Sequence, residues 1–299
     1  SSDDNWSTTN SIANTTTSLT YTNLSTTTKY RAVVTSGACS SDNSNEITIT
    51  VDPSSSGGAL TSNATVCETS NSGTLNLIGF VGSVTRWESS TNNWGSTTNI
   101  VNTTTSQAYN NLSTTTKYRV VVSSGAGACA SANSNEVTIT VDPASDGGTL
   151  STDATVCSGS NSGTLTLAGS VGSVTRWESS DDNWTTTNNI ANVTTSLTYT
   201  NLTATTKYRV VVTSGACVSD ISNEITITVD PAANGGTLSS DATVCEGSNS
   251  GTLTVTGVVG SITRWESSDD NWATTTNISN TTTSQAYTNL NVTTKYRVV

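Results

Sequence analysis

A segment of 88 to 90 residues recurs along the chain, and this period constrains the fold more than any other feature of the sequence. The tetrapeptide WESS begins at Trp87, Trp177 and Trp265. A second tryptophan recurs in step with it, at Trp6, Trp94, Trp184 and Trp272. The unit is longer than the roughly 20 to 50 residues of a solenoid repeat and close to the size of one independently folded domain. The period therefore predicts a string of separate domains.

Each repeat is followed by Val-Asp-Pro, a small polar run and Gly-Gly. Pro and Gly-Gly are typical of linkers, and they occur at Asp52-Pro53, Asp142-Pro143 and Asp230-Pro231, then at Gly57-Gly58, Gly147-Gly148 and Gly235-Gly236. The predicted organisation is the C-terminal part of a repeat at 1–52, complete repeats at 53–142 and 143–230, and the N-terminal part of a repeat at 231–299. A chain that ended inside such a domain would leave strand edges unpaired, so we expect the polypeptide to continue in both directions.

Polar and apolar residues alternate within one repeat, which predicts half-buried strands. In the first complete repeat the strands are expected at 73–79, 84–89, 106–112, 117–124 and 135–141, and Trp87 takes the place of the core tryptophan of immunoglobulin domains. Leu112, six residues before Tyr118, resembles the start of a tyrosine corner, in which the phenol bonds nearby backbone; an ordinary core tyrosine is the alternative. We expect Glu88 to meet Arg119 or Lys117 across the sheet. The predicted fold is all-β, with tandem immunoglobulin/fibronectin III-like β-sandwich domains.

The six cysteines occur in two alternating contexts, ATVC (Cys67, Cys157, Cys245) and SGAC or AGAC (Cys39, Cys129, Cys217). Because the chain has no histidine and no C-x-x-C pair, this placement predicts disulfides in an oxidising compartment rather than a metal site. The favoured pairs lie within a repeat, Cys67 with Cys129 and Cys157 with Cys217. Pairing of sequential neighbours would have to bridge the length of a domain. A third possibility joins Cys67 to Cys217 in the next repeat.

Composition argues against several functions. Without histidine, His-dependent triads, Cys–His dyads and His-liganded metal catalysis are unavailable. The net charge of -11 opposes binding to nucleic acid or to anionic membranes, and no segment approaches the roughly 20 apolar residues that direct membrane insertion needs. We therefore expect neither an enzyme nor a nucleic-acid partner, and no catalytic residues.

Two kinds of acidic group are the candidates for a metal or a carboxylate pair. Glu178, Asp181 and Asp182 could serve a glycosidase or Ca²⁺, as could the equivalent Glu266, Asp269 and Asp270. The repeat before them has Thr91 and Asn92 in place of the aspartates, which favours a solvated turn. The linker aspartates Asp52, Asp142 and Asp230 could bind Ca²⁺ between domains, although the dense acidic motifs of cadherin linkers are absent. We expect no other cofactor.

Trp94 and Trp184 lie in polar surroundings, NNWGS and DNWTT. An exposed indole there could stack on a sugar ring, so both are candidate glycan platforms. The alternative role is a lid on the edge of the sandwich, which we favour.

The combination ATVCSGSNSGTLTL, TRWESS, DDNW, LTATTKYRVVVTSGAC and SNEITITVDP resembles the repeats of giant SprB-type gliding-motility adhesins, which are type IX-secreted cell-surface proteins. This resemblance covers the whole chain and implies an extracellular, outer-membrane-associated stalk or filament that supports attachment and gliding. The implied partners are neighbouring repeats of the same chain and a surface polysaccharide or substratum. A carbohydrate-binding module, or an ancillary region of a secreted polysaccharide-degrading enzyme, is the alternative.

Overall fold

The computed structural model describes residues 1–68, 70–125 and 129–299, and the elements whose bounds lie within these ranges are strands. The chain forms two compact units. The first contains Ser1–Ala144 and Ser214–Val218, and the second contains Ser145–Thr213 and Ser219–Val299. The first unit thus includes a short loop from the repeat predicted at 143–230. The bounds of the four repeats themselves stay a prediction.

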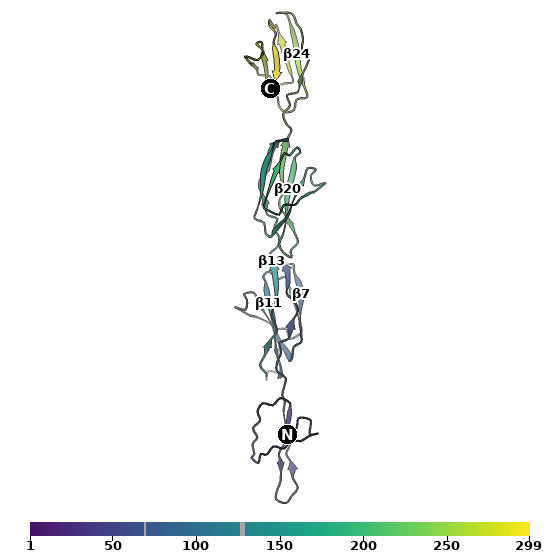
Figure 1. Ribbon diagram of the computed structural model, residues 1–299, viewed down its shortest axis with the longest axis vertical. Helices are drawn as coiled ribbons and strands as arrows, with labels where there is room; N and C mark the ends of the chain where they lie inside the picture. The colour runs from purple at the N-terminus through teal and green to yellow at the C-terminus, as the bar shows by residue number, and fades with distance from the viewer. Residues whose placement is uncertain (69, 126–128) are drawn as a thin grey trace. The chain divides into compact units, whose positions relative to one another are not determined.

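In the first unit, residues 53–142 form a sandwich of two sheets. One sheet has the order β10-β7-β5, with β5 at Ala59–Leu60, β7 at Ser72–Ile78 and β10 at Ser106–Asn110. The other sheet has the order β6-β13-β11-β8-β9, and β12 pairs with β11. Its strands are β6 at Ala64–Cys67, β8 at Ser83–Ser90, β9 at Thr98–Ile100, β11 at Thr116–Ser123, β12 at Ala132–Asn133 and β13 at Val137–Asp142. Figure 1 labels β7 of the first sheet and β11 and β13 of the second. Among the described strands of this repeat, β6 and β13 form the one parallel pair. The predicted all-β, immunoglobulin/fibronectin III-like sandwich is confirmed.

Residues 1–52 contribute short strand pairs to the same unit. The pairs are β1 at Thr28–Tyr30 with β4 at Ile47–Ile49, and β2 at Val33–Val34 with β3 at Asp42–Asn43. Val34 is 61% exposed here, whereas its equivalent Val122 in β11 is fully buried, because the sheet β10-β7-β5 covers it in the complete sandwich. The contrast shows that the covering sheet, rather than the strand itself, buries this position.

The second unit repeats the architecture. Its first sandwich has a sheet β14-β16-β19, at Thr149–Leu150, Ser162–Ala168 and Ser196–Thr200. The facing sheet is β15-β22-β20-β17-β18, at Ala154–Cys157, Ile225–Asp230, Thr206–Thr213, Ser173–Ser180 and Asn188–Ile190, with β21 at Asp220–Ile221 beside β20. Residues 231–299 form the sheets β23-β24-β27 and β26-β25-β28, at Thr237–Leu238, Ser250–Thr256, Ser284–Thr288, Thr276–Ile278, Trp265–Ser268 and Lys295–Val298.

The core of each complete sandwich is built around the tryptophan of WESS. Trp87 and Trp177 are fully buried, and each indole N–H donates to a loop carbonyl, that of Thr104 or Thr194, at 2.9 Å. The bond removes the cost of burying the polar end of the ring. Trp87 is surrounded by buried side chains that include Leu75, Leu77, Tyr118, Val120, Val122, Val137 and Ile139. Tyr109 and Val141 are only partly buried.

The predicted tyrosine corner is replaced by an asparagine clamp. Tyr208 is buried and packs on the Tyr199 ring, with centroids 6.4 Å apart, and in the described residues no hydrogen bond of its hydroxyl to the backbone is seen. Asn161 holds the chain before β20 instead: its amide donates to Cys157 O and Leu202 O at 2.7 Å, and its Oδ1 accepts from Leu202 N–H at 2.9 Å. Asn71 makes the same bonds with Cys67 and Leu112 in the preceding repeat. Tyr208 is therefore an ordinary core tyrosine.

The Gly147–Gly148 pair, interpreted from the sequence as part of a linker, packs against β21 of the same sandwich. The backbone N–H of Gly147 donates to Asp220 Oδ2 at 3.0 Å, and a Cβ at Gly147 would collide with the Ile221 backbone. Gly148 has a φ of +72°, a conformation in which glycine is unstrained. The pair lets the incoming chain pack directly on β21.

We predict that Asn161→Ala loosens the chain before β20. Loss of three hydrogen bonds at a partly buried site typically costs about 1–3 kcal/mol, so amide exchange around Leu202 is expected to accelerate about 10-fold or more by mass spectrometry. The peptide around Leu112 is an internal control, because Asn71 remains in place there. Unchanged exchange at Leu202 would contradict the clamp.

Candidate functional site

A disulfide joins two cysteines that lie in successive repeats. Cys67 bonds Cys217 across a sequence separation of 150 residues, with the Cα atoms 4.7 Å apart. Both cysteines belong to the first unit, because that unit includes the loop Ser214–Val218. We call this loop, together with Cys67, Asp142 and Pro143, the junction.

Strand pairing brings Cys67 to the junction. Cys67 is the last residue of β6 and lies opposite Asp142, the last residue of β13, in the parallel ladder. The next residue continues the contact, since Glu68 N–H donates to Asp142 O at 2.8 Å. The ATVC cysteine therefore lies where its own repeat ends and Pro143 begins the next one.

The linker aspartate holds the loop that carries Cys217. Asp142 Oδ2 accepts a hydrogen bond from Ala216 N–H at 2.9 Å, and Cys217 Sγ lies 3.2 Å from the Pro143 carbonyl oxygen. Gly215 has a φ of +44°, and a Cβ there would collide with the Asp142 carboxylate. The SGAC sequence thus supplies a close approach at glycine, a donor at alanine and a sulfur at cysteine.

The pairing of cysteines within a repeat is wrong. Cys67 pairs with Asp142 at the end of β13, and Ile139 of the same strand pairs with Thr116, the first residue of β11. Cys67 therefore lies at the end of the sandwich where β11 begins. Cys129 comes after the far end of β11 at Ser123. An eight-residue strand spans roughly 23 Å, whereas disulfide Cα atoms lie about 4.4–6.8 Å apart. Cys129 and Cys157, which were predicted to be bonded, are free thiols, as are Cys39 and Cys245.

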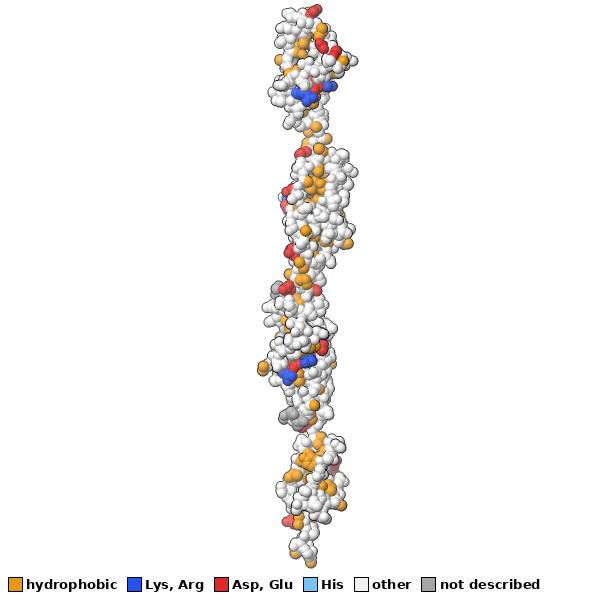
Figure 2. Space-filling view, turned by 90° about the vertical axis from the view of Figure 1, so that its left-hand side faces the viewer, with side chains coloured by type: hydrophobic (Ala, Val, Ile, Leu, Met, Phe, Trp, Pro, Cys, Tyr) orange, Lys and Arg blue, Asp and Glu red, His pale blue; other side chains and the backbone are white. Residues whose placement is uncertain are grey.

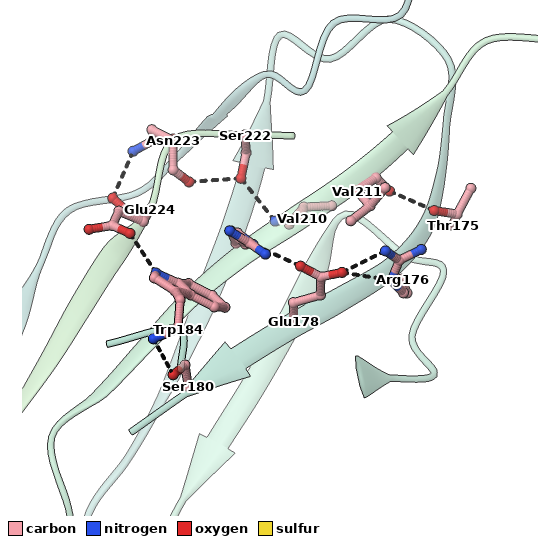
Figure 3. Close-up of polar contacts among 11 residues, drawn as sticks. Thr175, Arg176, Glu178, Ser180, Trp184, Val210, Val211, Ser222, Asn223 and Glu224 are labelled. Carbon is pink, nitrogen blue, oxygen red and sulfur yellow. Dashed lines mark hydrogen bonds and ion pairs between the residues drawn. The ribbon is translucent and has the colours of Figure 1, made fainter. Parts of the chain in front are cut away.

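In the larger sheet, a buried glutamate of one strand lies between an arginine of the same strand and an arginine of the neighbouring strand (Figure 3). Glu178 Oε1 pairs with Arg176 at 2.6 Å, and Glu178 Oε2 accepts from Arg209 Nε at 2.7 Å. In the preceding repeat Glu88 meets Arg119 at 2.7 Å, which confirms the predicted cross-strand pair, and also Arg86. Burial raises the pKa of Glu178, but the hydrogen bonds and charges of Arg209 and Arg176 outweigh it and leave the pKa below its ordinary value.

The second tryptophan packs against this cluster. The Arg209 guanidinium lies 3.9 Å from the Trp184 ring centroid, and the indole N–H donates to Glu224 Oε2 at 2.6 Å (Figure 3). Trp184 has a φ of +68°, rare for an aromatic residue, and Ser180 Oγ accepts its backbone N–H at 2.7 Å. Arg119 covers the Trp94 ring in the same way, at 4.1 Å. Both tryptophans therefore serve as a lid on the sheet, while their role as glycan platforms stays a prediction.

The acidic residues beside Trp184 do not converge on one point. Asp182 accepts hydrogen bonds from the Thr186 side chain and backbone and from Ser180, which lower its pKa. Glu178 faces its two arginines instead. In the described part of the chain, no group of three or more acidic or cysteine residues is arranged to hold a metal ion. Binding of Ca²⁺ by the linker aspartates stays a prediction.

Charge elsewhere is sparse. Figure 2 shows lysine and arginine beside acidic side chains in small mixed clusters, with uncharged surface between them. One such pair is Lys207 with Glu224 at 2.8 Å. Within the described ranges, no helix is long and apolar enough to cross a membrane.

A model of the family described as "Domain of unknown function (DUF8696)" matches residues 1–53, 56–143, 146–231 and 234–299. No curated protein matches the chain. Similar solved structures include the FN1–FN3 domains of chicken CNTN1, with 11% identity and a TM-score of 0.30 over 77% of this chain and 88% of that one. Another is domains A168–A170 of titin, with 16% identity and a TM-score of 0.36 over 69% and 76%. The fold described above rests on the strand topology.

We predict one disulfide and four thiols in the oxidised chain. Peptide mapping without reduction should link the Cys67 and Cys217 peptides, and a thiol reagent should titrate Cys39, Cys129, Cys157 and Cys245. Cys67→Ser should free Cys217 without creating a new bond to Cys157. A Cys67–Cys129 peptide would contradict the structure.

Acid should weaken the fold through the carboxylates whose pKa is lowered. Their contribution is fully present above an ordinary carboxyl pKa of about 4 and is lost as pH falls through the folded-state pKa, which is about 2 for Asp270. Glu178→Gln should lower the free energy of unfolding at pH 7 by about 1–3 kcal/mol and flatten its pH dependence below pH 5. Urea unfolding followed by tryptophan fluorescence measures both. Asp181→Asn, at an exposed neighbour outside these contacts, is the control, and equal effects of the two changes would contradict the role of Glu178.

Proposed function

Because the chain belongs to the family described as a domain of unknown function (DUF8696), its role has to come from its own residues, and we propose that it is a structural stalk segment of a bacterial cell-surface adhesin. The observation that carries this proposal is the Cys67–Cys217 bond between successive repeats. Disulfides persist in oxidising compartments, which supports display outside the cytosol. The stalk would support attachment and gliding motility, as the resemblance to SprB-type adhesins implies.

The junction suits a protein that transmits force. A peptide linker alone connects two domains through one flexible path. Here the disulfide and the Asp142–Ala216 hydrogen bond add a second path from the end of one repeat to a loop of the next. The added connection limits how far Pro143 and the residues after it can rotate or extend under load.

The strand order within a repeat suits the same task. The first strand of the larger sheet, β6, runs parallel to the last, β13, from the Ala64–Ile139 pair to the Cys67–Asp142 pair. A pull that enters near β6 and leaves through β13 displaces the two strands along their length, so their hydrogen bonds are loaded together rather than one after another. The β15–β22 pair has the same parallel register.

The proposed surroundings are extracellular, at the outer surface of the cell, after type IX secretion. The partners are neighbouring repeats and a polysaccharide or substratum contacted by other parts of the adhesin. We propose no enzymatic activity for these repeats, because Glu178 and Asp182 are each engaged by neighbouring side chains.

The proposal is tested in the bacterium that carries the gene. An epitope tag at exposed Val193 is expected to be labelled on intact cells and lost after external protease. Removal of whole repeats such as 143–230, which keeps the repeat phase, should reduce attachment and gliding while surface labelling persists. Trp94→Ala with Trp184→Ala should leave attachment unchanged. A tag that external protease cannot reach would refute the surface stalk. Glycan binding by the isolated chain that these two alanines abolish would favour the carbohydrate-binding alternative instead.

A further inference from the structure

The Cys67–Cys217 bond uses one cysteine of each sequence context. Cys67 is the ATVC cysteine of one repeat, and Cys217 is the SGAC cysteine of the next. The four free cysteines are two of each context: Cys157 and Cys245 follow ATV, whereas Cys39 and Cys129 follow SGA or AGA. Their equivalent partners, counted at a similar separation of about 150 residues, fall outside residues 1–299.

Cys129 lies at the Asp52-Pro53 segment in the position that Cys217 takes at Asp142-Pro143. Cys129 Sγ lies 3.8 Å from Asp52 O and 3.7 Å from Pro53 O. The corresponding distances from Cys217 Sγ to Asp142 O and Pro143 O are 3.7 and 3.2 Å. The free sulfur of Cys129 thus contacts its Asp-Pro segment at the place where the bonded sulfur of Cys217 contacts the Asp-Pro segment of the next repeat.

At the start of each loop, after β11 and after β20, Gly125 and Gly215 occupy equivalent positions. Gly125 has a φ of +64°, and an added Cβ would approach Asp52 Oδ2 to 2.7 Å. Gly215 has the same left-handed backbone and approaches Asp142. The loop therefore approaches Asp52 although Cys129 is not in a disulfide.

Cys157 reproduces the other half of the junction. It ends β15 opposite Asp230, as Cys67 ends β6 opposite Asp142. Ser158 N–H donates to Asp230 O at 2.8 Å, the same bond that Glu68 makes to Asp142. Cys157 is 60 residues from Cys217 in its own repeat but lies level with the start of β20, whereas Cys217 comes after its end at Thr213.

We propose that one register of disulfides applies at every junction of such repeats, from the ATVC cysteine of each repeat to the loop cysteine of the next. Once the repeat that contains residues 1–52 is complete, its ATVC thiol bonds Cys129, and the repeat before it bonds Cys39. Once the repeat at 231–299 is complete, its loop thiol bonds Cys157, and the repeat after it bonds Cys245. Each complete repeat then carries two covalent bonds, one to each neighbour, and none within itself. This inference rests on the junction geometry and not on the adhesin role.

The bond forms by exchange with the disulfide of a thiol–disulfide oxidoreductase. One repeat cysteine, as a thiolate, attacks a sulfur of that disulfide, and the oxidoreductase's other sulfur leaves as a thiolate. The second repeat cysteine then attacks the mixed disulfide and forms the new S–S bond. Two electrons pass to the oxidoreductase, which ends as a dithiol holding the two protons that the repeat thiols lost.

The first test completes the last repeat. Residues 34–52 are appended after Val299, because Val33 and Val299 are equivalent in the KYR motifs, and Cys39→Ser makes the appended loop cysteine distinct. Non-reducing peptide mapping should link this cysteine to Cys157 and retain the Cys67–Cys217 bond. A bond to Cys245 in its own repeat, a disulfide between two chains, or a thiol that stays free after oxidation would overturn the proposal. With Cys157→Ser in the same chain, the appended cysteine should become free.

A second variant keeps the test decisive if the appended segment fails to fold. Residues 143–178 are placed before Ser1, because Ser1 and Ser179 are equivalent in the SSDDNW motifs, and native Cys157 is changed to Ser. The added ATVC cysteine should bond Cys129 and protect it from a thiol reagent, whereas Cys129 reacts in the unextended chain. A bond from the added cysteine to Cys39 would show pairing within a repeat and contradict the register.

Discussion

The parallel pairing of β6 with β13 is the constraint on which the junction depends. It carries the first strand of the larger sheet alongside the last strand and ends with Cys67 beside Asp142. An antiparallel partner would have placed the cysteine at the other end of the sandwich, near the loop of its own repeat. The direction of one short strand therefore decides that the sulfur faces the following repeat.

The residues of the Val-Asp-Pro and SGAC motifs act as one unit. Asp142 accepts a backbone N–H from the loop, and Gly215 makes room for the Asp142 carboxylate. Each motif looks like an ordinary turn when it is considered alone. Together they form a contact between segments more than 70 residues apart, and the disulfide makes that contact permanent in an oxidising environment.

Within a sandwich, polar contacts replace much of what larger apolar side chains would supply. With one phenylalanine and no methionine in the chain, the core depends on valine, isoleucine and leucine around one tryptophan. The Glu178 cluster and the asparagine clamp at Asn161 tie strands and loops at the edge of this core. The Arg209 guanidinium stacks on the Trp184 ring, and this arrangement holds Trp184 in an unfavourable backbone conformation.

The all-β fold, the repeat period, the core position of Trp87 and the pairing of Glu88 with Arg119 could all be predicted from the amino-acid sequence. They depend on alternation and register that are local to a strand or to neighbouring strands. The sequence could not determine the cysteine pairing, since spacings of 62 and 150 residues are both compatible with a disulfide until the pole of the domain on which each sulfur lies is known. The asparagine clamp and the packing of Gly147 on β21 could not be predicted for the same reason, because both join segments that are distant in sequence. The cysteine pairing follows from the three-dimensional arrangement, because the direction of β6 and the length of β11 place Cys67 out of reach of Cys129 and beside Cys217.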